Sequence, residues 1–166
     1  MPEIRSTIQL QAVMSGLISE ILDQVTQELL DKLKEIIQEV VYDHGNPVNA
    51  YQRSSENENF KNSWIRDNAI QMGNSVESKI YQDPMLMGLD SSNFIHGSFG
   101  DDIRKDLAEV LNMGLTGPYW DDKTNQDPPL WWRLPRPYWD QFVEYFESNA
   151  RPMLIKAFAE KGLKVI

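Results

Sequence analysis

The sequence predicts an α+β fold in which a long N-terminal helix, a small antiparallel β-sheet, a short middle helix and a C-terminal helix packed on the sheet form a single domain. Three observations lead to this prediction. Apolar residues recur at helical spacing near the N-terminus, strand-like alternation follows a polar connector, and helical spacing returns in two later stretches. Because 166 residues suit one domain with a real core better than two, we expect residues 1–166 to form one domain.

The long first helix is predicted over residues 14–42, with Ser15 as its N-cap and the stretch from His44 to Pro47 as its stop. We expect its apolar stripe to pack on the domain's own sheet. The alternative is that part of the stripe pairs with neighbouring subunits. The stripe consists of Ile18, Leu22, Val25, Leu29, Leu33, Ile36 and Val40, and the opposite, polar face consists of Gly16, Glu20, Asp23, Gln27, Asp31, Lys34 and Gln38.

A β-hairpin is predicted over residues 60–81, after a polar connector over residues 45–60. Gly73-Asn74 is the expected turn, because such pairs favour the two-residue loops that join antiparallel strands. Asp83-Pro84 is expected to end the pairing, since proline has no amide hydrogen to donate. The residues expected to share a face are Trp64, Ile70 and Met72 in the first strand, and Val76, Ser78 and Ile80 in the second.

Two further helices are predicted. A short one opens at Asp101-Asp102, where the helix dipole favours acidic residues, and ends at Gly114. The last one starts near Pro137, and Pro152 is expected to kink or divide it. Residues 163–166 are a candidate terminal strand. The apolar side of the last helix consists of Trp139, Phe142, Val143, Phe146, Ala150, Met153, Leu154 and Ala157.

Composition narrows the classes of function. The formal net charge is -9, which argues against DNA or RNA as a direct ligand, because phosphate binding needs clustered lysine and arginine. The chain has no cysteine and therefore no disulfide framework and no thiolate chemistry. No basic region leads into an apolar core at the N-terminus, and no apolar run approaches the roughly 20 residues of a membrane span. We therefore expect no signal peptide and no membrane partner.

No arrangement of residues points to catalysis. His44 and His96 lie far apart in the sequence, and neither has a partner at metal-ligand spacing. The stretch from Asp121 to Asp127 offers oxygen donors but lacks the glycine and the terminal glutamate of an EF-hand loop. We therefore expect no catalytic residues, no metal and no cofactor, and we do not expect an enzyme.

A loop rich in tryptophan and proline, at about residues 115–137, is the most informative stretch. Four of the five tryptophans lie between residues 117 and 139, interleaved with prolines that disfavour a regular helix or a central strand. Such a loop either packs on its own domain as a lid or binds another protein. We expect Trp139 to belong to the domain's own core and the loop to form an interface through Tyr119, Trp120, Trp131, Trp132 and Arg133.

Several motifs together resemble one protein family. They are Asp106-Leu107-Ala108-Glu109-Val110-Leu111-Asn112-Met113-Gly114, Leu115-Thr116-Gly117-Pro118, Arg136-Pro137-Tyr138-Trp139, and Leu154-Ile155-Lys156-Ala157-Phe158-Ala159-Glu160-Lys161-Gly162-Leu163. Upstream, Asn46-Pro47-Val48-Asn49-Ala50-Tyr51-Gln52-Arg53 precedes Phe60-Lys61-Asn62-Ser63-Trp64. With these motifs the chain resembles the neck or tail-completion (head–tail joining) proteins of long-tailed double-stranded DNA bacteriophages. Arg151-Pro152 is an alternative for the family's Arg-Pro element.

The resemblance implies a small α+β domain that assembles into a homo-oligomeric ring in the virion, after synthesis in the cytoplasm of the bacterial host. The implied partners are a head-completion or portal-side protein on one face and tail terminator or tail-tube proteins on the other. The ring would encircle DNA without binding it specifically, and such proteins carry no catalytic residues. The alternative is a small monomeric domain that uses residues 117–139 to bind a peptide or a metal ion.

Overall fold

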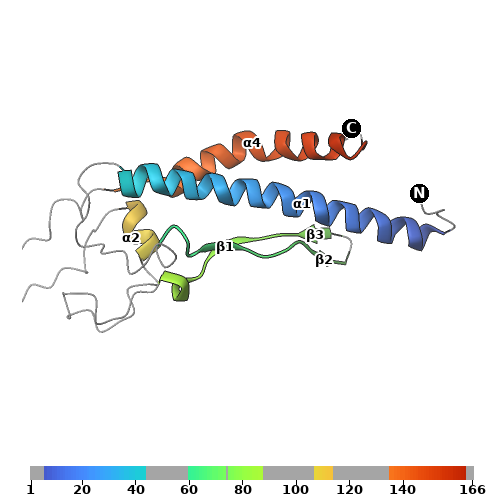
Figure 1. Cartoon of the computed structure of the whole chain (residues 1–166), viewed down its shortest axis with the longest axis horizontal. Helices are drawn as coiled ribbons and strands as arrows, with labels where there is room; N and C mark the ends of the chain where they lie inside the picture. Colours follow the sequence, from blue (N-terminus) through green and yellow to red (C-terminus); the bar gives the residue numbers. More distant parts are fainter. Residues whose placement is uncertain (1–5, 44–59, 74, 88–106, 114–134, 164–166) are drawn as a thin grey trace, which may run out of the picture. The chain divides into compact units, whose positions relative to one another are not determined.

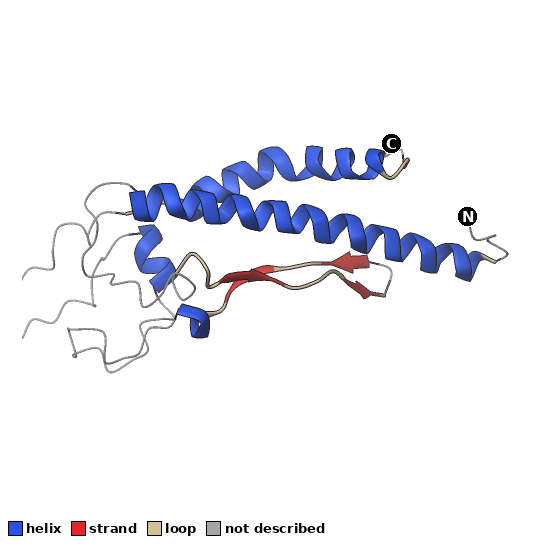
Figure 2. Ribbon diagram, viewed as in Figure 1, coloured by secondary structure: helices blue, strands red, loops and turns tan. Residues whose placement is uncertain are grey.

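The computed structural model describes residues 6–43, 60–73, 75–87, 107–113 and 135–163, and it confirms the α+β class (Figure 1, Figure 2). A long first helix, short antiparallel strands, a short middle helix and a long last helix follow one another along the chain. The elements are α1 (Thr7–Ile37), the π-helical segment η1 (Gln38–Asp43), β1 (Trp64–Arg66), β2 (Ile70–Met72), β3 (Ser75–Glu77), β4 (Ile80–Gln82), the 3₁₀ helix η2 (Pro84–Met87), α2 (Leu107–Met113) and α4 (Tyr138–Glu160).

The chain forms two compact units. The first unit comprises Met1–Asp31, Ile65–Tyr81 and Tyr145–Ile166, and the second comprises Lys32–Trp64 and Gln82–Glu144. Helices α1 and α4 contribute residues to both units. The single domain expected from the chain length stays a prediction.

Helix α1 begins seven residues earlier than predicted, at Thr7 instead of residue 14. Ser6 is its N-cap, because the Ser6 hydroxyl accepts a hydrogen bond from the amide of Gln9 at 3.2 Å. The predicted N-cap, Ser15, lies inside the helix, where its carbonyl accepts the hydroxyl of Ser19 at 2.9 Å. The residues between Thr7 and Ser15 are mostly good helix formers, so the helix continues upstream of the first strongly apolar stripe.

The buried part of α1 is broader than one stripe. Of the residues expected to be buried, Ile18, Leu22 and Val40 are only half-buried. The helix has neighbours on two sides in the first unit, where α1 lies between α4 and the hairpin (Figure 1). Side chains outside the expected stripe are therefore buried as well. The buried residues are Ile21, Val25, Thr26, Leu29 and Leu30 in the first unit, and Leu33, Ile36, Ile37 and Val41 in the second.

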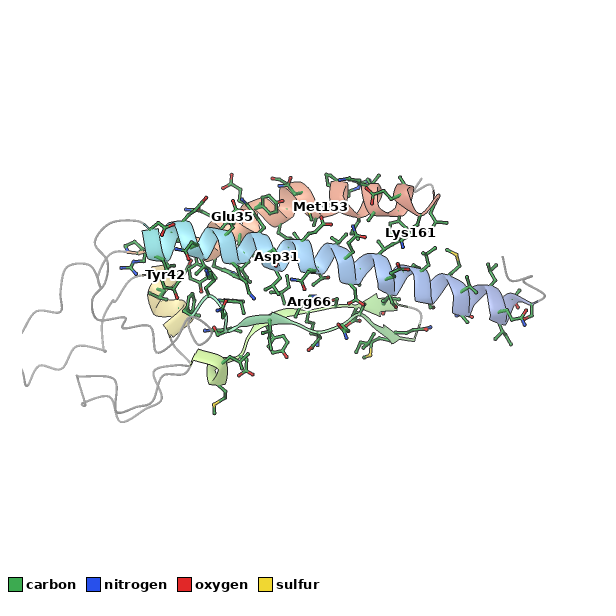
Figure 3. All side chains as sticks on the ribbon, in the orientation of Figure 1. Asp31, Glu35, Tyr42, Arg66, Met153 and Lys161 are labelled. Atoms are coloured by element: carbon green, nitrogen blue, oxygen red, sulfur yellow. The ribbon has the colours of Figure 1, made fainter. Side chains whose placement is uncertain are left out.

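Polar residues of α1 join it to the hairpin in the first unit. Arg66 points from the hairpin toward α1 (Figure 3). Its guanidinium donates to the carboxylate of Asp23 and to the side-chain carbonyl of Gln27, each at 2.9 Å. The same Asp23 oxygen accepts the backbone amide of Ala69 at 2.7 Å. One carboxylate therefore binds both a side chain and the backbone of the hairpin, which sets the position of the hairpin along the helix.

The end of α4 also contacts α1 in the first unit, through an ion pair between Lys161 and Glu20. The helix closes at Gly162, whose φ of 76° lies in the left-handed region that favours glycine. The amide of Leu163 returns to the carbonyl of Phe158 at 3.0 Å, as expected for a capped helix end. Leu163 is not in a strand, and the rest of the predicted terminal strand, residues 164–166, lies outside the described residues.

The hairpin contains two short antiparallel sheets instead of one: β1 pairs with β4, and β2 pairs with β3. The predicted turn is confirmed, because β2 and β3 are joined by the two residues after Met72, and Gly73 has a φ of 62°. The register changes between the sheets. The amide of Asp67 donates to the carbonyl of Lys79, whereas Ile70 lies opposite Glu77. Between these two pairs the first strand advances by three residues and the second by two, so the first strand contains one extra residue.

The extra residue explains why the shared face predicted for the first strand is wrong. In the second strand, the residues predicted to share a face are all half-buried between exposed neighbours: Val76, Ser78 and Ile80. Adding one residue to a strand moves every following side chain to the other face of the sheet. Trp64 is buried with 7% of its surface exposed, whereas Ile70 and Met72 are 56% and 54% exposed. All three residues of β2 are exposed, whereas burial alternates within β3 and within β4.

Pro152 was expected to kink or divide the last helix. Helix α4 is continuous through Pro152, so the helix is not divided there, and a kink stays a prediction. The helix begins at Tyr138, directly after Arg136-Pro137. Arg136-Pro137 therefore stands directly before the last helix, whereas Arg151-Pro152 lies inside it. The start of the middle helix predicted at Asp101-Asp102 lies outside the described residues.

Loss of the Asp23 carboxylate is expected to destabilise the protein. Asp23→Ala removes the ion pair with Arg66 and the acceptor for the amide of Ala69, which should lower the free energy of unfolding by about 1–2 kcal/mol. Glu28→Ala is the matched control, since it removes the same charge from an exposed position on α1 and should change stability by less than about 0.5 kcal/mol. Urea denaturation of both variants tests this, and equal midpoints would contradict it.

Candidate functional site

Five aromatic side chains form a cluster in the second unit, which we call the aromatic cluster: Phe60, Trp64, Tyr138, Trp139 and Phe142. Phe60, Trp64 and Tyr138 meet edge to face, with ring centroids 5.4–6.4 Å apart. Trp139 stacks on Trp64 at 5.2 Å and contacts Phe142 at 5.5 Å. These are the distances and orientations that aromatic pairs favour, so the cluster is a packed centre and not a chance grouping.

A turn before β1 brings Phe60 and Trp64 to the same place. The hydroxyl of Ser63 is fully buried and donates to the carbonyl of Phe60 at 2.7 Å, which closes the turn. The backbone carbonyl of Ser63 accepts the amide of Asp83 at 2.8 Å, and its hydroxyl accepts the side-chain amide of Gln82 at 3.3 Å. The short polar residue between the two aromatic rings therefore fixes them against the end of the hairpin.

Helix α2 and the start of α4 are joined by three hydrogen bonds. The amide of Arg136 donates to the carbonyl of Leu111 at 2.9 Å, and the hydroxyl of Tyr138 donates to the carbonyl of Ala108 at 3.1 Å. The side chain of Asn112 accepts the amide of Trp139 at 3.0 Å. Because the first amides of a helix have no partner within the helix, Asn112 caps α4 from a different helix.

These three bonds hold together the two ends of the tryptophan/proline segment, residues 114–134. The described residues that flank it are Met113 and Pro135. Both are adjacent to residues that bind one another across α2 and α4. The aromatic cluster therefore forms the base of the segment that carries the predicted interface residues.

Arg136 is buried, with 9% of its surface exposed, and it binds the C-terminal continuation of the first helix, η1. Its guanidinium donates to the carbonyl of Val41 in η1 at 3.2 Å. Carbonyl groups at the C-terminal end of a helix lack partners within the helix and attract cations. Lys61 reaches the same segment through Gln38, at 3.0 Å. The two cations stabilise the end of the long helix, which is a structural role.

The titratable group at the centre of the cluster is Tyr138, of which 1% is exposed. Burial raises the pKa of its hydroxyl well above the ordinary value, because a phenolate in this apolar setting would lose its hydration. The hydroxyl therefore stays protonated and keeps its bond to Ala108. A buried group of this kind holds the structure together and does not serve as a general base near neutral pH.

The contacts shown among the described residues are packing contacts, hydrogen bonds and ion pairs. Among these residues, no group of three or more His, Asp or Glu side chains is placed to hold a metal ion. In the same parts of the chain, no helix is long and apolar enough to cross a membrane.

The indole Nε1 of Trp64 is buried and has no hydrogen-bond acceptor within the described structure. An unpaired indole in the core costs stability, so the stacking against Trp139 must outweigh that cost.

The predicted interface residues and the candidate metal loop lie outside the described residues. They are Tyr119, Trp120, Trp131, Trp132 and Arg133 for the interface, and Asp121 to Asp127 for the loop. His44 and His96 also lie outside them. What the structure brings together is the set of motifs around the loop: Phe60 to Trp64, the helix that ends at Met113, and Arg136 to Trp139.

The predicted burial of Trp139 is wrong. Trp139 has 37% of its surface exposed, and Phe146, expected on the same face, is 45% exposed. The inward position belongs to Tyr138, one residue earlier, in line with Phe142 and Ala157. Trp139 instead lies at the edge of the cluster and covers Trp64.

Sequence reasoning missed three residues of the site: Tyr138, Arg136 and Asn112. Tyr138 and Arg136 stood in a motif that had been quoted for its resemblance alone. The signal for Asn112 was its place at the end of a short helix, where amide side chains often bind backbone groups.

Comparison of the chain with family models, with curated proteins and with solved structures gives no match.

The two neighbouring aromatics of α4 are expected to differ in their effect on stability. Phe142→Ala should lower the free energy of unfolding by about 3–5 kcal/mol, because the side chain is buried in the cluster. Trp139→Ala should cost only about 1–2 kcal/mol, because a third of its surface already faces solvent. Thermal and urea unfolding of the two variants measures this. A larger loss for Trp139→Ala would place that residue in the core after all.

The raised pKa of Tyr138 predicts a loss of stability in alkali. In the folded state the Tyr138 hydroxyl keeps its proton, whereas in the unfolded state it releases the proton above pH about 10. The contribution of the protonated hydroxyl to the free energy of unfolding is therefore fully present below pH about 10 and is lost as the pH rises further. At pH 7, Tyr138→Phe should be less stable than the wild type by about 1 kcal/mol, through loss of the bond to Ala108. The stability of the wild type relative to the variant should fall by about 1.4 kcal/mol per pH unit above 10, so by pH about 11 the variant should be the more stable protein. Urea midpoints at pH 7 and at pH about 11 test this, and a constant difference would refute it.

Proposed function

We propose that this chain is a structural subunit of the ring at the head–tail junction of a long-tailed double-stranded DNA bacteriophage. In this role it couples the portal or head-completion complex on one face to tail terminator or tail-tube proteins on the other. It encircles DNA without binding specific bases, and it performs no catalysis. Its place is the virion neck.

One observation supports this proposal most directly: motifs that lie far apart in the sequence meet in the aromatic cluster. Phe60 and Trp64 come from the motif before the hairpin, Ala108 and Asn112 from the middle helix, and Arg136 to Trp139 from the element that opens the last helix. These stretches are among the motifs that carry the resemblance. Their convergence indicates that they form one packing unit, as expected if the resemblance reflects a common fold.

The charge of the chain is consistent with a channel around DNA. A net charge of -9 repels phosphate, so packaged DNA would pass such a ring without binding to it. The base of the tryptophan/proline segment is held by α2 and α4, so residues 114–134 are attached to a fixed part of the second unit. Tryptophan, tyrosine and arginine are the residue types that dominate protein–protein contacts.

The proposal is tested in the phage that encodes the chain. A nonsense mutation in its gene should give DNA-filled heads and separate, complete tails, and antibodies against the chain should label the junction of wild-type particles. Addition of the purified protein to the mutant lysate should restore joined particles. Labelling elsewhere on the particle, or normal joining in the mutant, would refute the proposal and favour the small monomeric binding domain.

The tryptophan/proline segment should be needed for joining and not for folding. We expect a Trp131→Ala/Trp132→Ala double variant to unfold at nearly the wild-type temperature and to fail to restore joined particles, because an interface anchor contributes about 2 kcal/mol or more to binding. Trp139→Ala is the control, since it belongs to the aromatic cluster and should lose stability instead. A double variant that joins heads to tails normally, or that unfolds by itself, would make the segment an intramolecular lid.

A further inference from the structure

The first turns of α1 carry an apolar stripe that is partly exposed. Figure 1 shows α1 continuing past the end of α4 and past the turn of the hairpin in the first unit. Leu10 and Val13 are each 46% exposed, and Met14 and Leu17 are half-buried. These four residues follow the spacing of one helix face, and we call them the uncharged stripe. It continues toward the buried residue Ile21.

The surroundings of the stripe are unusual for this chain. Residues 6–19 contain no charged side chain, although charged residues make up 25% of the sequence. It is the longest such stretch in the described parts of the chain. The polar residues around the stripe are Ser, Thr and Gln. A solvated helix face in an acidic protein usually carries charges, so this surface has the composition of a contact surface.

A second surface of the first unit is also without charged residues and also exposes apolar side chains. Residues 68–76 at the end of the hairpin are also without charge, and Ile70 and Met72 on one face of β2 are more than half exposed. We call Ile70 and Met72 the hairpin tip. The two surfaces differ in shape, since one is a helix stripe and the other is a strand face.

We propose that the uncharged stripe of one copy packs against the hairpin tip of a second copy of this chain. The contact rests on the proposed homo-oligomeric ring, and it names the surfaces that the ring would use. A ring requires that one patch meets a different patch on the next subunit, and the stripe and the hairpin tip are such a pair.

Charge identifies the occupant as a second copy. Two copies that each carry a net charge of -9 repel one another wherever acidic surfaces meet, so association is favoured where both surfaces are neutral. A strongly basic partner would find no acidic residue between residues 6 and 19. Helices that lie on lipid usually carry lysine and arginine on their polar face, and residues 6–19 contain neither.

The contact is expected to be weak between two isolated subunits. A helical stretch of fourteen residues is about 21 Å long, and a strand face of two side chains adds little area. Contacts of this size lie below the usual area of stable interfaces, and they correspond to dissociation constants of roughly micromolar or above. In a closed ring the contact would occur once per subunit, and each subunit would be held by two such contacts, so the ring would be more stable than an isolated pair.

A charge placed in the stripe should abolish self-association. Val13→Glu puts a carboxylate into the stripe, whereas Ala12→Glu adds the same charge to an exposed position on the other side of the helix. In sedimentation velocity at roughly 10–500 µM protein, the wild type and Ala12→Glu should associate with increasing concentration. Val13→Glu should stay monomeric or weaken association at least tenfold. Circular dichroism and urea midpoints should be unchanged in both, since neither position is buried.

Cross-linking identifies the partner surface, because the chain has no cysteine of its own. A mixture of Val13→Cys and Met72→Cys proteins should form disulfide-linked dimers under mild oxidation, faster than either protein alone and faster than a mixture of Val13→Cys with Glu28→Cys. Dimers of Val13→Cys alone would mean that the stripe meets another stripe. That result, a wild type that stays monomeric, or equal behaviour of the two glutamate variants would overturn the proposed contact.

These outcomes are distinct from failure of the proposed function. Self-association through the stripe in a protein that is not found at the head–tail junction would refute the function and keep the contact. A protein found at the junction, with Val13→Glu restoring joined particles as well as Ala12→Glu does, would keep the function and refute the contact.

Discussion

The rest of the structure depends on α1, a helix of 31 residues that no single partner covers. Its middle carries apolar side chains and two polar residues, Asp23 and Gln27, that bind the hairpin. Its C-terminal continuation offers backbone carbonyls that bind Arg136. Its first turns keep an apolar stripe exposed. The helix therefore differs along its length: its middle binds the hairpin, its C-terminal continuation binds Arg136, and its first turns leave apolar side chains exposed.

The aromatic cluster meets a different constraint, which is to join stretches that are distant in the sequence. Bringing distant stretches of chain together costs conformational entropy, and strong contacts offset that cost. Edge-to-face rings, a helix cap from Asn112 and the buried hydroxyl of Tyr138 supply these contacts. Three of the motifs that carry the resemblance contribute to them: Phe60 to Trp64, the end of α2, and Arg136 to Trp139.

Much of the fold could be predicted from the sequence, because helical spacing and the Gly73-Asn74 turn are local signals. The start of α1 could not, since Thr7 to Met14 has good helix formers but no stripe as strong as the one that follows. The predicted face of the last helix includes the buried Phe142 and Ala157, but its first residue, Trp139, is exposed. Tyr138 and Trp139 are both large aromatics, and periodicity alone does not choose between them. The choice depends on Ala108 and Trp64, which are distant in sequence. The contact between Asp23 and Arg66 was hidden for the same reason.

Identical acidic subunits face a problem that different partners do not. A neighbour of another kind can present basic residues to acidic surfaces, but a second copy repeats the same charge, and its like charges repel. A chain with a net charge of -9 therefore needs a neutral surface for contact with itself, and it can use charged or aromatic surfaces for other proteins. The uncharged residues 6–19 belong to the first unit, and the base of the tryptophan/proline segment belongs to the second. Under the proposed function, self-contact and contact with other neck proteins thus fall to different units, so a substitution in one surface leaves the other contact intact.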